Sequence, residues 1–400
     1  MPAREALAVN HAEQALSHWD QLSDFPLPAT GAQSTSSAPG GGEASSAALA
    51  CSDMALWSER VRRRQRSSWQ PVGTTPQVLS AEGFRGWPYF VRVPEDYRGD
   101  EPFPVIIYLA GNAGPAIEGA LLANEGVADT GYLVVYPHAN GFWWHSQPTA
   151  MTSVLLDDVL RRFNVDTRRI YLTGLSNGGT GTLYYATLWP HRFAAAVSAM
   201  GAGLWVPELE KDNEPLPHNS DNLPMLFLHG ADDPVIQADA TRGTVEQMAG
   251  HSAPLESHIF PERGHEIILG RGYDGMTLAF FHRFQRDPFP RTLNFQARTL
   301  RAPRLYWVEM LEKDDGLAEV KAEIEKNNTI RLNTHRVRKL RLLLRSELFA
   351  SPGPVRVLLN GKEVFSGELP ADCSILERSL QQTADPLLAW SSELIFEVPK

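Results

Sequence analysis

The 400-residue chain has few cysteines and no long apolar run, and both shortages limit what it can be. Only Cys51 and Cys373 occur, so a disulfide framework of the small secreted kind is excluded, and neither lies in a metal-ligand spacing. We expect both to be free thiols, which favours a reducing compartment. No apolar run approaches the roughly 18 residues of a membrane-spanning helix, so we expect no membrane span.

The chain also has fewer basic than acidic residues. The chain has 37 Lys and Arg residues against 47 Asp and Glu residues, which gives a formal net charge of −10. Nucleic acids and membrane surfaces are polyanionic, so this balance argues against a general binder of either. Hydrophobic residues make up 43% and charged residues 21%, as is typical of a folded protein with sizeable cores. The sequence leaves the oligomeric state open.

Residues 1–22 mix charged side chains with alanine and leucine, which is the pattern of an amphipathic helix. They lack the apolar core of a signal peptide. We therefore expect a cytoplasmic protein, with secretion as the alternative if the true start lies elsewhere.

Three regions follow from changes in composition. The first holds a Gly/Ser-rich stretch at 29–48 that buries too little surface to fold. In the second, apolar runs alternate with helical patterns; in the third, only β patterns occur. The predicted divisions are 1–73 for N-terminal helices and linker, 74–290 for an α/β catalytic domain, and 300–400 for a C-terminal β-sandwich domain.

The middle region predicts an α/β fold with a doubly wound, mostly parallel sheet, because its strands alternate with helices. In the third region, Asn360-Gly361 is typical of a type I′ hairpin turn, and the short strands around it predict a β-sandwich. The expected strands are 89–93, 105–109, 132–136, 169–173, 193–198, 225–228 and 257–260, then 305–308, 320–324, 330–332, 355–359, 364–365 and 394–398. The expected helices are 154–163, 180–188 and 276–284.

One strand of the middle region ends in a pattern that carries chemistry. The strand at 169–173 continues as Gly174-Leu175-Ser176-Asn177-Gly178-Gly179, and a helical stretch follows. A serine on a tight turn between strand and helix, with small residues on both sides, is the nucleophile elbow of serine hydrolases. A phosphate-binding loop would need a lysine where Thr180 stands. The pattern therefore predicts Ser176 as a nucleophile.

An acid and a base are expected after later strands. Asp232 and Asp233 both follow the strand at 225–228, and we prefer Asp233 because it directly precedes Pro234-Val235. His265 follows the strand at 257–260 in a loop that can reach over the sheet edge. His229 is the rival base, but its place before a glycine suits holding the turn. The predicted triad is thus Ser176, Asp233 and His265, with no metal and no cofactor.

The negative charge of the reaction intermediate needs two backbone N–H donors. The amide of Asn177, directly after the nucleophile, is one expected donor. The second is expected in the loop after the strand at 105–109, at Asn112 or alternatively at Ala113.

Residues 163–179, together with 89–97, 104–114, 194–203 and 223–235, resemble bacterial esterases related to polyhydroxybutyrate depolymerases and feruloyl esterases, and equally prolyl-oligopeptidase-like hydrolases. The resemblance covers roughly 85–285 and implies an α/β-hydrolase that cleaves esters or related acyl bonds without a metal. These families usually carry a His-Gly pair where this chain has Ala110-Gly111. The backbone donor survives that change, but a histidine that packs the loop is lost.

Three functions stay open from the sequence. The first is a carboxylesterase that acts on a small-molecule ester, with Trp143 and Trp144 lining its pocket; alternatively, both indoles pack under their loop. The second is a prolyl-oligopeptidase-like peptidase, although nothing repetitive of propeller size occurs. The third is a non-catalytic protein that binds carbohydrate or a partner through a basic stripe on the β-sandwich, unless that stripe is a solvated strand face. The stripe comprises Arg331, Arg336, Arg338, Lys339, Arg341 and Arg345.

Overall fold

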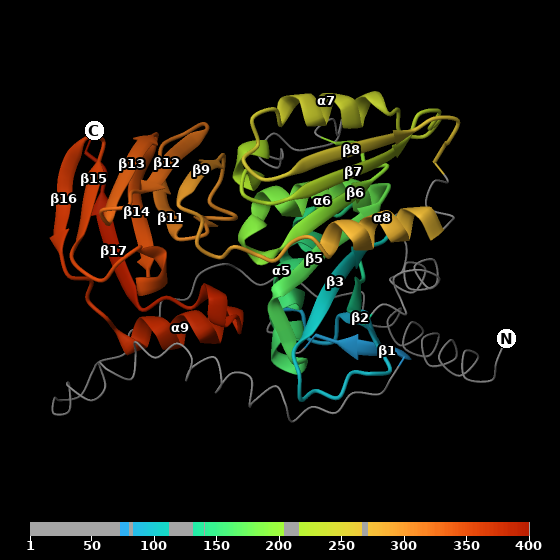
Figure 1. Ribbon diagram of the computed structural model, residues 1–400, viewed down its shortest axis with the longest axis horizontal. Coiled ribbons are helices and arrows are strands. Elements are labelled where there is room, and N and C mark those ends of the chain that lie inside the picture. The colour runs from blue at the N-terminus through green and yellow to red at the C-terminus, as the bar shows by residue number, and fades with distance from the viewer. Residues whose placement is uncertain are drawn as a thin grey trace.

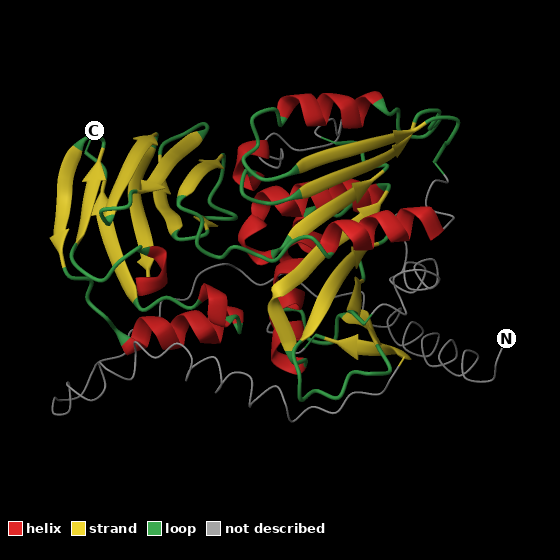
Figure 2. Cartoon of the chain, in the orientation of Figure 1, coloured by secondary structure: helices red, strands yellow, loops and turns green. Residues whose placement is uncertain are grey.

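The computed structural model describes residues 73–79, 83–111, 131–139, 141–203, 216–265 and 271–399. The helices and Gly/Ser-rich linker expected before residue 73 lie outside these ranges. The first half of the described chain forms an eight-stranded sheet with helices on its faces, and the second half forms two smaller sheets (Figures 1 and 2). The predicted fold class is therefore confirmed. We call residues 73–281 the α/β part and residues 292–397 the β-sandwich.

The large sheet has the strand order β1-β2-β4-β3-β5-β6-β7-β8. Strands β3 to β8 run parallel, while β1 and β2 are antiparallel to their neighbours. Its strands are β1 (Gly73–Val78), β2 (Pro88–Val93), β3 (Phe103–Leu109), β4 (Leu133–Pro137), β5 (Val165–Leu175), β6 (Ala195–Ala199), β7 (Met225–Gly230) and β8 (Leu255–Phe260).

Alternate side chains of the sheet point into two different cores. Val105 and Ile107 of β3 pack with residues of α5 (Ser146–Arg162) and α6 (Asn177–Leu188) on one face. Ile106 and Tyr108 pack on the other face with Phe281 of α8 (Arg271–Phe281). Burial on both faces explains why the central strands are apolar throughout. The remaining helices of this part are α7 (Asp239–Gln247), η1 (Pro190–Arg192) and η2 (Pro217–Ser220).

Some element predictions were incomplete or wrong in the α/β part. Helix α5 begins at Ser146, eight residues before the predicted start of 154, because Pro148 in its first turn is compatible with a helix. Strand β1 was missed because it is a short edge strand that contains a proline. Helix α7 was missed because its only buried residues are Thr241 and Thr244, which give no apolar periodicity.

The β-sandwich is built from two sheets that share one core. Their strand orders are β10-β11-β14-β17 and β16-β15-β13-β12-β9. The predicted Asn360-Gly361 turn is confirmed, since φ is 49° at Asn360 and 80° at Gly361. The elements are β9 (Thr292–Ala297), β10 (Arg304–Leu305), β11 (Val308–Lys313), β12 (Ala318–Ile324), β13 (Thr329–His335), β14 (Val337–Leu344), η3 (Ser346–Leu348), β15 (Val355–Leu359), β16 (Lys362–Gly367), α9 (Cys373–Thr383), η4 (Pro386–Leu388) and β17 (Ser392–Glu397).

The strand predicted at 305–308 is instead a tight hairpin. Leu305 pairs with Val308, so Tyr306 and Trp307 form the turn between β10 and β11, with φ of 50° at Tyr306. Both aromatic side chains are buried, and the Trp307 indole donates to the carbonyl oxygen of Pro290 at 2.8 Å. Turns are ordinarily polar, so the apolar residues of this turn led to the prediction of a strand.

The prediction of two free cysteines is wrong for Cys373, which is disulfide-bonded. Cys51 lies outside the described residues. Pairing depends on which residues meet in space, and sequence spacing does not reveal it. The inference of a reducing compartment from free thiols therefore loses its basis.

The β-sandwich packs against the amino-terminal edge of the large sheet. Asn219 of η2, which precedes β7, donates to the carbonyl oxygen of Gln296 at 3.0 Å and accepts from the Gln296 amide at 2.7 Å. Arg161, in the last turn of α5 before β5, donates to Gln381 of α9. Segments that precede parallel strands lie at the edge where those strands begin. In Figure 1 the arrowheads of β7 and β8 accordingly point away from the β-sandwich.

A buried ion pair lies at this junction. The Arg286 guanidinium contacts the Asp385 carboxylate at 2.8 Å and donates to the carbonyl oxygen of His191 at 2.9 Å. Both charged side chains are at most 1% exposed. Nearby, Asp157 of α5 pairs with Arg192 at 2.5 Å, and Asp157 is largely buried.

We predict that Arg286→Ala destabilises the protein strongly, because it leaves the Asp385 carboxylate buried without its counter-ion. Removing one partner of a buried pair costs about 3–5 kcal/mol in the free energy of unfolding. The matched control is Arg356→Ala, which breaks an exposed pair with Glu363 and should cost about 0–1 kcal/mol. Chemical denaturation measures both, and equal losses would contradict the prediction.

Candidate active site

Ser176 stands on the sharp turn between β5 and α6 that the sequence predicts. Strand β5 ends at Leu175 and helix α6 begins at Asn177, so Ser176 is the only residue between them. Its backbone has φ of 54° and ψ of −118°, a conformation that L-residues rarely adopt. The Ser176 amide donates to the carbonyl oxygen of Ala199 at 2.8 Å, and its own carbonyl accepts from Thr180 at 3.0 Å. These bonds hold the strained residue in place.

Gly178 allows the start of α6 to lie directly on the end of β3. A Cβ at this position would come within 1.9 Å of the carbonyl oxygen of Leu109 and 2.8 Å of that of Ala110. Both atoms belong to backbone that cannot rotate away. Only glycine therefore fits, and the nucleophile turn and the loop after β3 are in direct contact.

The three residues predicted as a triad lie in one hydrogen-bonded line. His265 Nε2 is 3.0 Å from Ser176 Oγ, and His265 Nδ1 is 2.7 Å from Asp233 Oδ2. An ionised carboxylate only accepts, so Nδ1 carries the proton and Nε2 is left free to accept from the serine hydroxyl. The His265 side chain is 24% exposed and that of Asp233 is fully buried. The base can thus be reached from outside, while its acid cannot.

The surroundings of Asp233 favour its charged form. Burial opposes ionisation, but hydrogen bonds from His265 and from the backbone amides of Ile236 and Val235 outweigh it and lower the pKa of Asp233 below its usual value. Asp232, the alternative acid, is exposed and its amide donates to the carbonyl oxygen of Arg263. The structure therefore brings Asp233, and not Asp232, to the histidine.

His229 contacts the same carboxylate oxygen as His265. Its Nε2 is 2.8 Å from the carbonyl oxygen of Ile236, which can only accept, so Nε2 carries a proton. That nitrogen is also 3.3 Å from Asp233 Oδ2, and Nδ1 is 2.8 Å from the hydroxyl of Thr241. Burial lowers the pKa of His229, which keeps it neutral. His229 holds the acid's turn, as the sequence suggested.

Gly230 brings the acid and base loops together. A Cβ at Gly230 would lie 2.3 Å from the carbonyl oxygen of Gly264 and 2.4 Å from that of Arg263. The loop after β8 therefore passes directly over the end of β7, and His265 reaches Asp233 although 32 positions separate them.

Of the two predicted oxyanion donors, Asn177 lies within the described residues and Asn112 lies outside them. Asn177 is 8% exposed and is the first residue of α6. Its amide thus lies beside Ser176 at the positive end of the helix dipole. Asn112 and the alternative Ala113 lie outside the described residues, and their role stays a prediction. The described loop ends with Ala110 and Gly111.

The aromatic pair proposed as pocket walls is buried. Trp143 is 1% exposed and Trp144 is 6% exposed. Trp144 stacks on Phe142, with ring centroids 4.7 Å apart, and the Trp143 indole donates to the carbonyl oxygen of Ala110 at 2.9 Å. Both indoles pack under their loop, as in the alternative stated above. Whether Trp144 also borders a substrate stays a prediction; the bond from Trp143 to Ala110 had no signal in the sequence.

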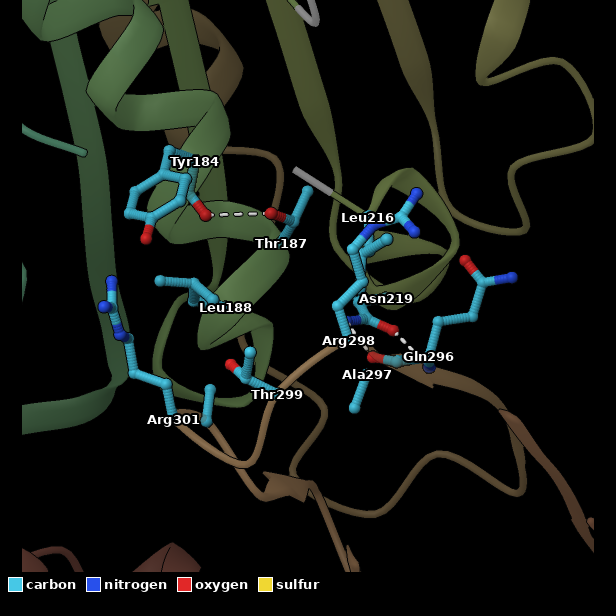
Figure 3. Close-up of a pocket in the computed structure, with 11 residues that line it drawn as sticks. Tyr184, Thr187, Leu188, Leu216, Asn219, Gln296, Ala297, Arg298, Thr299 and Arg301 are labelled. Atoms are coloured by element: carbon cyan, nitrogen blue, oxygen red, sulfur yellow. Dashed lines mark hydrogen bonds between the residues drawn. The ribbon is translucent and has the colours of Figure 1, made fainter. Parts of the chain in front are cut away.

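A separate pocket lies at the junction with the β-sandwich (Figure 3). It is lined by Tyr184, Thr187 and Leu188 near the end of α6, by Leu216 and Asn219, and by Gln296, Ala297, Arg298, Thr299, Arg301 and Ala302. Because Ser176 precedes the first residue of α6, this pocket lies at the opposite end of that helix from the serine. It is not the catalytic cleft.

Two further features concern the described residues alone. They contain no group of three or more His, Cys, Asp or Glu side chains placed to hold a metal ion. Within the same residues, no helix combines the length and the apolar character needed to cross a membrane.

Comparison with known proteins finds relatives among hydrolases and esterases. The model of the Dienelactone hydrolase family matches residues 143–269, which include Ser176, Asp233 and His265. The chain is 29% identical over 125 residues to bifunctional acetylxylan esterase/xylanase XynS20E of Neocallimastix patriciarum, covering 30% of this chain and 17% of that protein. It is 27% identical over 143 residues to acetylxylan esterase A of Emericella nidulans, covering 32% and 46%. It is 26% identical over 98 residues to carboxylesterase SOBER1 of Arabidopsis thaliana, covering 24% and 42%.

The chain thus spans less than half the length of these curated relatives. Among solved structures, a thermostable esterase has 21% identity and a TM-score of 0.43, covering 53% of this chain and 63% of that one. Dipeptidyl peptidase 4 of Porphyromonas gingivalis has 16% identity and the same TM-score, covering 56% and 37%. The resemblance to esterases of the α/β-hydrolase superfamily is confirmed by the family and sequence matches. The narrower likeness to polyhydroxybutyrate depolymerases and feruloyl esterases stays a prediction.

We predict that Gly178→Ala disrupts the nucleophile turn, because the new methyl group would overlap the Leu109 carbonyl. Gly275→Ala in α8 is the matched control, since a Cβ there meets nothing within 4 Å and alanine favours helix by about 1 kcal/mol. Thermal unfolding should show a large loss of Tm for Gly178→Ala and none for Gly275→Ala. An unchanged Tm for Gly178→Ala would contradict the packing described here.

Proposed function

We propose that this protein is a serine hydrolase that cleaves carboxylic esters through Ser176, His265 and Asp233. The observation that carries the proposal is the unbroken hydrogen-bonded line from the Ser176 hydroxyl through the His265 ring to the buried Asp233 carboxylate. The matched family and the esterase relatives support the same chemistry.

In the first half of the reaction, Ser176 Oγ attacks the ester carbonyl carbon while His265 Nε2 takes the hydroxyl proton. The charged Asp233 carboxylate stabilises the imidazolium that forms and fixes its tautomer. The carbonyl oxygen becomes negatively charged, and the Asn177 amide, with the predicted Asn112 amide, donates to it. When the intermediate collapses, His265 gives the proton to the leaving alcohol, and the acyl group stays on Ser176.

In the second half, water replaces the alcohol. His265 takes a proton from the water as it attacks the acyl-serine ester, and then returns that proton to Ser176 Oγ. The products are a carboxylic acid and the regenerated serine. No metal or organic cofactor is needed at any step.

The substrate we propose is a small-molecule ester with a short acyl group. The curated relatives are named acetylxylan esterases and a carboxylesterase, which supports an acetyl or similarly short acyl group. The β-sandwich lies at the amino-terminal edge of the sheet, opposite Ser176, and so does not restrict the approach to the serine.

The basic stripe that motivated the alternative of a non-catalytic binding protein gives little support to that alternative in the structure. Five of the six basic residues of the stripe on the β-sandwich pair with acidic neighbours. Lys339 pairs with Glu397 at 2.8 Å and Arg341 with Glu309 at 3.3 Å. Arg331 pairs with Glu325, and Arg345 is mostly buried beside Glu347. A surface of paired charges offers little net attraction to an anionic partner.

The test is turnover of p-nitrophenyl acetate, butyrate and octanoate by the wild type and by Ser176→Ala. Removal of the nucleophile should lower kcat by about 10⁴–10⁶-fold. Asp233→Asn should lower kcat by about 10⁴-fold because the amide favours the wrong tautomer of the histidine. Its matched control, Asp232→Asn, changes an exposed neighbour and should keep wild-type activity.

An inert wild type, or an active Ser176→Ala variant, would refute the proposal. A prolyl p-nitroanilide forms a parallel arm: faster turnover of the anilide than of every ester would replace the esterase by a peptidase of the same mechanism.

A further inference from the structure

Trp143 links the loop after β3 to the helix that presents the nucleophile. Its indole N–H donates to the carbonyl oxygen of Ala110 at 2.9 Å, across 33 positions in sequence. Ala110 directly follows the last residue of β3 and carries only a methyl side chain. The methyl group cannot form a hydrogen bond that would hold the loop, so the indole bonds to the backbone carbonyl of Ala110 instead.

Trp143 is itself fixed on α6. The Tyr185 hydroxyl donates to the carbonyl oxygen of Trp143 at 2.7 Å. A Cβ added to Gly181 would lie 2.4 Å from the Trp143 Cβ, so the residue rests directly against the helix backbone. Trp143 is 1% exposed and Tyr185 is fully buried, which raises the pKa of the Tyr185 phenol and keeps it a neutral donor. The Trp143 end of the link is thus fixed on α6.

The link matters because α6 and the loop after β3 are the two elements expected to bind the oxyanion. Hydrogen-bond donors stabilise a transition state only when they are already in place, with donor–acceptor distances of about 2.7–3.1 Å. A misplacement of about 1 Å can cost about 100-fold in rate. Gly178 sets the contact between the two elements on one side, at Leu109 and Ala110. The Trp143 indole holds the same Ala110 carbonyl from another side.

We propose that Trp143, held by Tyr185, is a positioning residue that fixes the start of the loop after β3 relative to Ser176. This inference rests on the proposed esterase function. It makes Trp143 a residue that positions an oxyanion-binding element, and not a wall of the substrate pocket. Loss of the indole N–H would leave the buried Ala110 carbonyl without this partner and allow the loop to shift. Substrate binding should be little affected, because the indole is buried beneath the loop.

The experiment compares Trp143→Phe with Trp307→Phe. Trp307 is an equally buried indole that donates to a backbone carbonyl at 2.8 Å, but it lies in the β-sandwich. Both variants lose one N–H donor and the same side-chain volume. For each, we would measure Tm, the kcat and KM for p-nitrophenyl acetate, and hydrogen–deuterium exchange of the peptide that contains Ala110 and Gly111.

We expect Trp143→Phe to lower kcat by about 10- to 100-fold, with KM within about two-fold and faster exchange of the Ala110 peptide. Trp307→Phe should lower Tm by a similar amount but change neither kcat nor that exchange. Tyr185→Phe, which keeps the indole and removes only its support, should give a smaller loss of kcat in the same direction.

Unchanged exchange at Ala110 in Trp143→Phe would overturn the proposal whether or not the protein is an esterase. Equal losses of kcat in Trp143→Phe and Trp307→Phe would overturn it too, since they would reflect general stability. An inert wild type would instead refute the esterase function, and exchange alone would then decide whether Trp143 holds the loop.

Discussion

The buried carboxylate of Asp233 accepts hydrogen bonds from the His265 ring and from two backbone amides, and His229 lies 3.3 Å from the oxygen that His265 contacts. A charge that is removed from water is tolerated only where such donors replace it. Here they come from the end of β7 (His229), from the loop after β8 (His265) and from the acid's own turn (Val235 and Ile236). The position of His265, and with it the orientation of the base toward Ser176, depends on that carboxylate.

The two edges of the large sheet at which its strands begin and end have different neighbours. At the carboxyl-terminal edge, close backbone contacts at Gly178 and Gly230 bring the ends of β3, β5, β7 and β8 together around the serine. At the amino-terminal edge, Arg286 lies between the two parts in sequence, and its buried guanidinium bridges the His191 carbonyl oxygen of the α/β part and the Asp385 carboxylate of the β-sandwich. The β-sandwich is therefore attached at the edge of the sheet opposite Ser176, Asp233 and His265.

Sequence reasoning located the three side chains that the structure brings into one hydrogen-bonded line because each has a local pattern. The serine needs small neighbours between a strand and a helix, and the acid and base each follow a strand, so their order along the chain is readable. Contacts between distant segments left no such pattern. The bond from Trp143 to Ala110 spans 33 positions and that from Arg286 to Asp385 spans 99. The Cys373 disulfide and the buried Tyr306-Trp307 turn were misread for the same reason, since burial and partners are set by the whole fold.

The central claim is that Ser176 Oγ is the nucleophile. The most direct measurement is to treat the protein with a fluorophosphonate, which reacts with activated serines, and to locate the adduct by mass spectrometry of peptides. The account predicts one adduct per chain, on the peptide that contains Ser176, and its absence in Ser176→Ala. No adduct on the wild type, or an adduct on another residue, would contradict it.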